Sequence, residues 1–176
     1  MFLSRFFRKR PAEAAGAALF AAAAQQARTP ALYARFGSPD TLEGRFELYT
    51  LHVVMLVERL SGQGDQAQET SQGLFDAYVR SLDDALRQIG VGDLSMGKKM
   101  KKLAGAFYGR LATWEEAVAP LPDRTALEAM LGRTVFEGAE NAEPSALADY
   151  AVRTREALAA QPLANLLSGE VSWPQP

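Results

Sequence analysis

Apolar residues recur at a spacing of three and four between Leu32 and Leu60, which is the clearest pattern in the chain. This spacing is that of one buried face of an α-helix. Pro39 disfavours helix before it, and Asp40 or Thr41 can accept hydrogen bonds from the free amides of a first turn. We therefore expect a core helix that starts at Asp40 or Thr41. Its apolar face is formed by Leu42, Phe46, Tyr49, Val53, Leu56 and Leu60.

The same spacing predicts helices over most of the remaining chain. They cover residues 12–28, 32–36 and 69–89, a long segment capped by Ser95, and shorter segments that begin at Thr113, Asp123 and Pro144, with a last turn after Pro162. Gly90 is the expected end of the helix over 69–89. No stretch of any length alternates with the period of a β-strand. The sequence therefore predicts an all-α fold, a single compact multi-helix domain over residues 12–176 that follows a short basic tail over residues 1–11.

Three residues of the central helix are not required by helix formation. Gly44 costs roughly 1 kcal/mol relative to alanine, so either another backbone lies close to it or the helix is irregular there. Arg45, His52 and Arg59 recur every seven residues and share a stripe. The stripe is either a functional surface or a partly buried histidine beside two surface arginines. A metal site is not expected, since one histidine without cysteines leaves zinc and haem short of ligands.

A second unusual stretch follows Ser95. Lys98, Lys102, Gly105 and Gly109 form one line on the predicted helix. The two glycines cost about 2 kcal/mol in helix propensity, and small residues four apart create a groove in which another backbone can lie. This groove receives either a neighbouring helix of the same domain or a partner. The exposed lysines, Lys98, Lys99, Lys101 and Lys102, are either a solvated face or a contact for phosphate or anionic lipid.

Acidic residues of the helix over 69–89 allow two interpretations. Asp83 and Asp84 together could support acid-base or Mg²⁺ chemistry. An arginine stands four residues after Asp83, at Arg87, and the same spacing joins Asp76 to Arg80. Neighbouring cations favour surface ion pairs over a metal site.

Composition limits the remaining possibilities. A chain of 176 residues with 48% hydrophobic residues can bury one substantial core. The net charge of -2 gives no global basic field, so a DNA partner is not expected. The absence of cysteine removes disulfides and thiol catalysis. The longest apolar run, residues 14–24, is too short to cross a hydrocarbon core of about 30 Å, so we do not expect an integral membrane protein.

The first ten residues mix bulky apolar with basic side chains. They include Phe2, Arg5, Phe6, Phe7, Arg8, Lys9 and Arg10. A signal peptide is not expected, because no leucine-rich core follows. Each basic residue contributes roughly 1 kcal/mol of attraction to an anionic membrane. The segment is therefore either a peripheral membrane contact or a solvated tail.

Several motifs occur in order and span most of the chain from the first helix to Trp114. They read QAR.P at 26–30, G.PDT..GRFE at 37–47, LFD at 74–76, DD.LRQIGVGDLS at 83–95 and K.MKKLAGAFYGRL at 98–111. Taken together, these motifs resemble the ubiquinol-cytochrome c chaperone family, the assembly factors of the respiratory cytochrome bc1 complex. Beyond Trp114 the likeness is limited to scattered positions and a Trp-Pro ending.

The resemblance implies a non-enzymatic helical chaperone, without a cofactor, that binds newly made cytochrome b and promotes its maturation into the bc1 complex. Mitochondrial relatives work with a small helper protein and at the ribosome, which makes both of these possible partners. The short basic N-terminus, without a long presequence, indicates a bacterial member at the cytoplasmic face of the inner membrane. The candidate contacts for the client are Arg45, His52, Asp83, Arg87, Asp93, Lys98, Lys102, Gly105, Tyr108, Gly109 and Arg110. Asp83 and Asp93 also have structural explanations that fit equally well, an ion pair for Asp83 and a helix cap for Asp93.

Three other functions compete with this one. An enzyme built on His52 would need a convergent acid or base, which no motif supplies. A ribosome-associated or RNA-associated adaptor could act through Lys98 to Lys102, and its binding would fall steeply with added salt. A haem carrier could use His52 as an axial ligand, but no second ligand is paired with it by spacing.

Overall fold

The computed structural model describes residues 2–137, 139 and 142–176, with side chains described from Pro11 onward. These residues form eight α-helices and no β-strand, as the sequence predicts. The helices are α1 (Phe2–Gln26), α2 (Pro30–Ala34), α3 (Leu42–Leu60), α4 (Asp65–Gln88), α5 (Asp93–Val118), α6 (Thr125–Thr134), α7 (Pro144–Ala160) and α8 (Leu163–Leu167). The expected all-α fold is confirmed.

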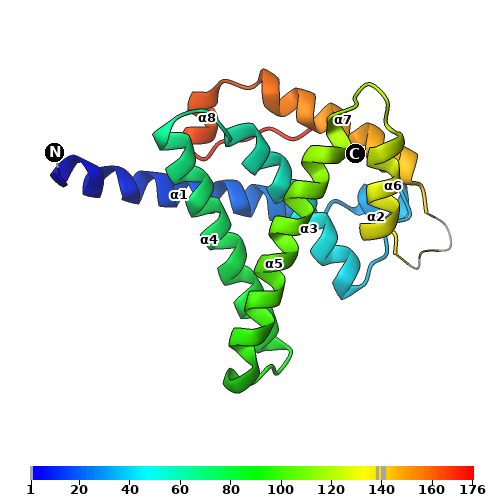
Figure 1. Ribbon diagram of the computed structural model, residues 1–176, viewed down its shortest axis with the longest axis horizontal. Helices are drawn as coiled ribbons and strands as arrows, with labels where there is room; N and C mark the ends of the chain where they lie inside the picture. The colour runs from blue at the N-terminus through cyan, green and yellow to red at the C-terminus, as the bar shows by residue number, and fades with distance from the viewer. Residues whose placement is uncertain (1, 138, 140–141) are drawn as a thin grey trace.

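Helix α3 lies at the centre of the molecule and packs against α1, α4, α5 and α7 (Figure 1). Its N-cap is Thr41, whose hydroxyl accepts a hydrogen bond from the amide of Gly44, so the predicted start is confirmed. The single apolar face predicted for this helix is too narrow. Buried residues lie on all sides of its second half, whereas Leu42 is 60% exposed. A helix surrounded by neighbours buries more than one stripe.

Two glycines show where backbones come close together. A Cβ on Gly44 would lie 2.1 Å from the carbonyl oxygen of Pro39, which explains the predicted need for space there. A Cβ on Gly16 would lie 2.3 Å from the backbone nitrogen of Leu74. Helices α1 and α4 therefore pack backbone to backbone, and Gly73 on α4 completes this contact.

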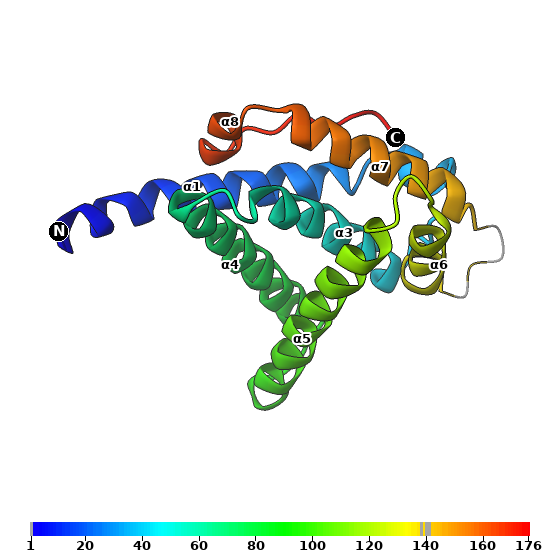
Figure 2. The same ribbon diagram turned by 45° about the horizontal axis from the view of Figure 1, so that its top comes forward.

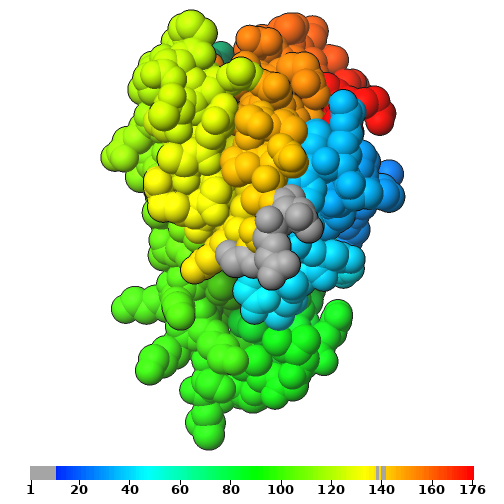
Figure 3. All heavy atoms as spheres, turned by 90° about the vertical axis from the view of Figure 1, so that its right-hand side faces the viewer, coloured from blue at the N-terminus to red at the C-terminus, as the bar shows by residue number. Residues whose placement is uncertain are grey.

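Helices α4 and α5 form a long antiparallel hairpin whose end projects from the rest of the molecule (Figure 2). Figure 3 shows the same end, in green, below the helices of the body. Gly90 ends the first helix with φ of 86°, as expected for a glycine stop. Buried residues of α4 end at Tyr78, and α5 has none between Met96 and Phe107, so the outer part of the hairpin has a large solvent-exposed surface.

Several predicted boundaries are wrong. Helix α5 begins at Asp93, and Ser95 lies in its first turn, where its hydroxyl donates to the carbonyl of Gly92. No new helix starts at Thr113, which lies inside α5 and donates to the carbonyl of Gly109. Helix α4 starts four residues before the predicted Glu69. Capping motifs inside a long amphipathic segment do not end a helix that tertiary packing continues.

The remaining boundaries agree more closely with the sequence. The cap predicted at Asp123 is one residue too early, because the N-cap of α6 is Arg124; the Asp123 carboxylate accepts from the amide and hydroxyl of Thr125. Pro144 begins α7 as predicted. Helix α1 begins at Phe2 and continues through Pro11, so the backbone of the predicted tail is helical. The membrane-contact residues expected there, Phe2, Arg5, Phe6, Phe7, Arg8, Lys9 and Arg10, have side chains outside the described residues.

Candidate functional site

A groove lies between the end of α3, the start of α4 and the second half of α5. Its volume is about 580 Å³. The apolar part of its lining consists of Val57, Leu60, Phe75, Phe107, Tyr108 and Leu111, while Asp65, Gln68 and Gln72 supply polar groups. The lining thus combines aromatic and aliphatic surface with a few polar side chains, as binding sites commonly do.

Aromatic contacts hold the two walls of the groove together. The rings of Phe75 and Phe107 lie 5.0 Å apart, and the ring of Tyr108 lies 5.5 Å from Phe75. Phe107 points into the core with 2% exposure, whereas Tyr108 is 59% exposed. The exposed ring therefore stands at the edge of the groove, where it can contact another molecule without disturbing the fold.

Gly105 and Gly109 lie on an open face of α5 beside this groove. A Cβ added to either glycine would meet no atom within 4 Å. Lys98 and Lys102 are exposed on the same side of the helix. The two lysines, two glycines and Tyr108 are the predicted site residues that the structure gathers on one surface. No other helix in the described part of the chain fills the glycine line, so of the two alternatives the structure does not show the one of internal packing.

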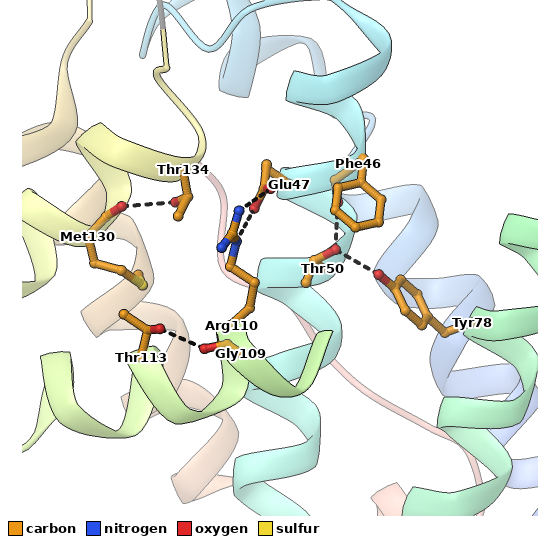
Figure 4. Close-up of polar contacts among 9 residues, drawn as sticks. All are labelled: Phe46, Glu47, Thr50, Tyr78, Gly109, Arg110, Thr113, Met130 and Thr134. Carbon is orange, nitrogen blue, oxygen red and sulfur yellow. Dashed lines mark hydrogen bonds and ion pairs between the residues drawn. The ribbon is translucent and has the colours of Figure 1, made fainter. Parts of the chain in front are cut away.

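Arg110 lies on another side of α5 and holds this helix against α3. Its guanidinium donates two hydrogen bonds to the carboxylate of Glu47, at 2.8 and 2.7 Å (Figure 4). The hydrogen bonds to Glu47 raise the pKa of Arg110 above its ordinary value. A bidentate pair of this kind fixes orientation as well as distance. Arg110 is thus engaged within the fold and positions α5, rather than facing a partner.

Thr50 of α3 holds α4 in place through a hydrogen bond to Tyr78, which is also drawn in Figure 4. Its hydroxyl donates to the carbonyl of Phe46 at 2.8 Å, so it accepts the hydrogen bond, at 2.9 Å, from the hydroxyl of Tyr78. Burial raises the pKa of Tyr78 to about 12, so the phenol stays protonated. Buried hydrogen bonds from α3 therefore fix the base of the hairpin.

The acidic candidates lie near the end of the hairpin. Arg87 donates to Asp83 and to Asp93, in both cases at 2.8 Å. The ion pair predicted for Asp83 is thus present, and Arg87 also connects the end of α4 to the first turn of α5. The predicted ion pair of Asp76 with Arg80 is absent. Arg80 donates instead to the backbone carbonyl of Asp76, and the side-chain carboxylate of Asp76 accepts from Gln72. These contacts give the acidic residues a structural role.

The stripe of Arg45, His52 and Arg59 does not form one surface. Arg45 is exposed and pairs with Asp40 at 2.6 Å, and this hydrogen bond lowers the pKa of Asp40. Arg59 donates to the carbonyls of Leu158 and Gln161 at the end of α7. The three side chains point to different neighbours because α3 is covered on several sides.

His52 is fully buried, so it does not reach a partner in this conformation. Its Nδ1 donates to the carbonyl of Leu48 at 2.7 Å, because a carbonyl oxygen only accepts. Its Nε2 therefore accepts from the hydroxyl of Tyr150 at 2.9 Å, and Tyr150 in turn accepts from the amide of Gln26. Burial lowers the pKa of His52 to about 4 and raises that of Tyr150. Of the two alternatives for His52, the partly buried histidine is closer to the structure, in which the side chain is fully buried and both ring nitrogens are hydrogen-bonded.

The buried network leaves no free imidazole nitrogen for haem or for proton transfer to a substrate. Gln26 also donates to the carbonyl of Pro174, and the ring of Trp173 lies 5.3 Å from that of His52. The network therefore connects α1, α3, α7 and the C-terminal segment. Among the described residues, no group of three or more histidine, aspartate or glutamate side chains is placed to hold a metal ion.

Sequence reasoning missed the groove, although its residues were visible as apolar positions. Phe75, Phe107 and Leu111 lie on apolar stripes at helical spacing, which is typical of core positions. A side chain on such a stripe can equally line a groove where two helices diverge. The signal that could have found the groove was the polar loop before α4, since its small residues Ser61, Gly62 and Gly64 are part of the lining.

The fold and sequence match known proteins. Residues 34–173 match the family described as ubiquinol-cytochrome C chaperone. The structure is also similar to that described as the crystal structure of the Cbp3 homolog from Brucella abortus, with a TM-score of 0.85 and 32% sequence identity. The similarity covers 99% of this chain and 97% of that one. No curated protein matches the sequence.

These matches confirm the resemblance found in the sequence motifs. The family match covers far more than half of the chain, and it includes α3, the hairpin and the C-terminal helices. It therefore also covers the region beyond Trp114, where the motifs fade. The chain belongs to the ubiquinol-cytochrome C chaperone family.

Proposed function

We propose that this protein is a non-enzymatic chaperone that binds newly made cytochrome b and promotes its maturation into the cytochrome bc1 complex. Membership of the ubiquinol-cytochrome C chaperone family supports a role in assembly of that complex. The choice of cytochrome b as client comes from what the family resemblance implies. The groove and the open face of α5 support client binding at the hairpin.

The observation that carries this proposal is the open glycine line of α5. Gly105 and Gly109 together cost about 2 kcal/mol of helix propensity, and no packing within the described chain offsets this cost. A helix with small residues four apart lets another helix approach its backbone closely. An apolar helix of a membrane-protein client can therefore lie along this face, with bulky side chains directed at Tyr108 and Leu111 of the groove.

We infer a peripheral location at the cytoplasmic face of the bacterial inner membrane. No helix among the described residues is long and apolar enough to cross a bilayer. The basic and aromatic residues at the start of α1 have a composition suited to anionic lipid. Contact with a small helper protein or the ribosome is a further part of this proposal, which rests on the family resemblance alone.

Deletion of the gene tests the function. We expect a selective fall in haem-loaded cytochrome b, measured by difference spectroscopy of membranes, while another respiratory cytochrome stays at its normal level. Reintroduction of the unaltered gene should restore the signal. Unchanged cytochrome b in the deletion strain would contradict the proposal and favour an RNA-associated adaptor that acts through the exposed Lys98 and Lys102.

Crosslinking tests the site. A photoreactive phenylalanine analogue in place of Tyr108 should form an adduct with cytochrome b in growing cells. The same analogue at Ala129, exposed on α6, serves as the control. Adducts at position 129 but none at position 108 would place the client elsewhere.

Substitutions on α5 test the need for close approach. Gly105→Leu or Gly109→Leu adds a side chain to an open surface, so the fold should persist while cytochrome b maturation falls. Ala129→Leu adds comparable bulk away from the hairpin. Normal cytochrome b levels in both glycine variants would show that the glycine line is not a client site.

A further inference from the structure

The end of the α4–α5 hairpin exposes two large aliphatic side chains to solvent. Leu94 is fully exposed, and Ile89 is 59% exposed. Both lie beside the turn that joins the two helices, at the end that projects from the body (Figure 1). Neither side chain contributes to the core at this position, so their burial against another surface would be favourable.

Lysines follow the aliphatic residues along α5. Lys98 and Lys101 stand four and seven residues after Leu94, which puts them on the same side of the helix. At 1.5 Å per residue they lie about 6 and about 10 Å from Leu94 along the axis. Lys99 and Lys102 are exposed at the same level, on the neighbouring side. Within the described residues, none of these four lysines is held in an ion pair.

Positive charge therefore dominates this end of a chain whose net charge is -2. Three acidic residues, Asp83, Asp84 and Asp93, lie in the parts of α4 and α5 next to the turn between them. Arg87 binds two of them, Asp83 and Asp93, through hydrogen bonds of 2.8 Å. The charges of the lysines remain available to a negatively charged surface.

We propose that the end of the hairpin, residues 89–102, binds the surface of an anionic lipid bilayer. Leu94 and Ile89 enter the boundary between headgroups and acyl chains, and the lysines lie at the level of the phosphates. Aliphatic side chains ahead of a ring of basic ones are the pattern of interfacial membrane binding. An RNA partner would use the lysines but would leave the aliphatic residues without a role, since nucleobases stack on aromatic side chains.

This contact is separate from the one expected at the start of α1. Figure 1 shows the N-terminal end of α1 and the end of the hairpin at different extremities of the molecule. A test of the hairpin must therefore report from the hairpin itself. Sedimentation with vesicles alone would not distinguish the two ends.

A single fluorescent label gives that local report. The chain has no cysteine, so Leu94→Cys can be labelled specifically with an environment-sensitive nitrobenzoxadiazole dye. Vesicles of equal parts phosphatidylglycerol and phosphatidylcholine should shift the emission to the blue and raise its intensity. Leu42→Cys, at a leucine 60% exposed at the start of α3, is the matched control and should not respond. An unchanged Leu94→Cys spectrum while the protein sediments with the vesicles would overturn the proposal.

Affinity measurements with unlabelled protein separate the two kinds of contact. Leu94→Asp should weaken vesicle binding about tenfold, because the aliphatic anchor is lost. Lys98→Gln combined with Lys101→Gln should weaken it about 25-fold, at about fivefold for each charge. The matched double variant Arg133→Gln with Arg153→Gln removes two exposed charges elsewhere and should bind normally.

An RNA contact would give a different pattern of results. A polyuridine oligonucleotide would then bind the protein and lose affinity in the lysine variant but not in Leu94→Asp, with no spectral response to vesicles. That pattern would overturn the membrane proposal. Because these experiments use only purified protein with vesicles or oligonucleotide, they stand or fall independently of the cytochrome b proposal.

Discussion

The buried histidine predicts a specific loss of stability in mild acid. His52 is fully buried, and its two ring nitrogens are bound to Leu48 and Tyr150. Burial lowers its pKa from 6.5 to about 4. The unfolded chain therefore takes up a proton at a pH where the folded chain does not, and protonation favours unfolding. The contribution of neutral, buried His52 to the free energy of unfolding is complete above pH 6.5 and is lost as the pH falls toward 4.

The magnitude follows from the two pKa values. A histidine with a pKa of 6.5 in the unfolded chain and about 4 in the folded one lowers the free energy of unfolding by about 2 kcal/mol between about pH 7 and about pH 5. Other titrating groups add their own pH dependence. The contribution of His52 must therefore be measured as a difference between two proteins.

His52→Gln provides the comparison. The amide oxygen of glutamine can accept from Tyr150, and the side chain does not titrate in this range. Urea unfolding followed by tryptophan fluorescence gives the free energy of unfolding of both proteins, since Trp114 is 1% exposed and reports on the core. We expect the variant to be less stable than the unaltered protein at neutral pH. The difference between their free energies of unfolding should shrink by about 2 kcal/mol at about pH 5.

Proton NMR gives an independent check. The chain has one histidine, so its imidazole resonance can be assigned without ambiguity. The folded protein should show a titration midpoint near 4 rather than 6.5. A midpoint near 6.5, or a gap between the two proteins that does not change with pH, would refute the burial of His52 and the hydrogen-bond network built on it.

Other predictions concern the glycines, the ion pairs and the start of the chain. Gly16→Ala should lower the free energy of unfolding by about 2 kcal/mol, because the added Cβ would collide with the backbone of α4. Gly105→Ala adds its Cβ in open space and should raise the free energy of unfolding by about 1 kcal/mol. Equal effects of the two substitutions in urea unfolding would contradict the close packing of α1 on α4. Arg110→Ala should lower the free energy of unfolding by about 2 kcal/mol, because it leaves Glu47 unpaired. Arg87→Ala removes exposed ion pairs and should lower the free energy of unfolding by less than about 1 kcal/mol. Urea unfolding measures both effects. In a protein that also carries Leu94→Asp, Lys98→Gln and Lys101→Gln, deletion of residues 2–10 should move the remaining membrane-bound protein to the supernatant, and unchanged fractionation would exclude a membrane contact at the start of α1.

Local signals in the sequence predicted most of the helices. Thr41 and Pro144 mark helix starts through the backbone geometry and hydrogen bonds of their immediate neighbours, and the structure confirms both. Gly44 was expected to allow close approach, and Pro39 lies against it. These features depend on residues a few positions apart, which is why single-sequence reasoning could find them.

Contacts between distant residues could not be predicted in the same way. The partner of His52 is Tyr150, 98 residues further along the chain, and the partner of Arg110 is Glu47, 63 residues before it. Helical periodicity places a side chain on a face but does not say which element covers that face. For this reason His52 and Arg110 were both expected at a partner surface, although the structure uses them inside the fold.

The open glycines were recognised from the sequence, but their surroundings were not. Gly16 and Gly105 both interrupt helices, and their residue type alone gives them the same interpretation. The structure separates them, because a backbone covers Gly16, whereas no atom of the described residues lies within 4 Å of a Cβ placed on Gly105. Only the second glycine leaves its cost in helix propensity without an offset inside the chain, and it is therefore the one that points to a partner.

Helix α5 joins the two proposed contacts along one face. Leu94, Lys98, Lys101, Gly105 and Tyr108 follow each other at spacings of three and four, so the bilayer contact and the groove lie on one line. Tyr108 stands about 21 Å from Leu94 along the axis. If the hairpin is upright on the membrane, the groove lies beyond the headgroups, where an apolar segment outside the bilayer would otherwise be exposed to water. Taken together, the two proposals predict that the hairpin offers a client that must enter the membrane an apolar surface close to the bilayer, and that the lysines between the two contacts hold this surface at the interface.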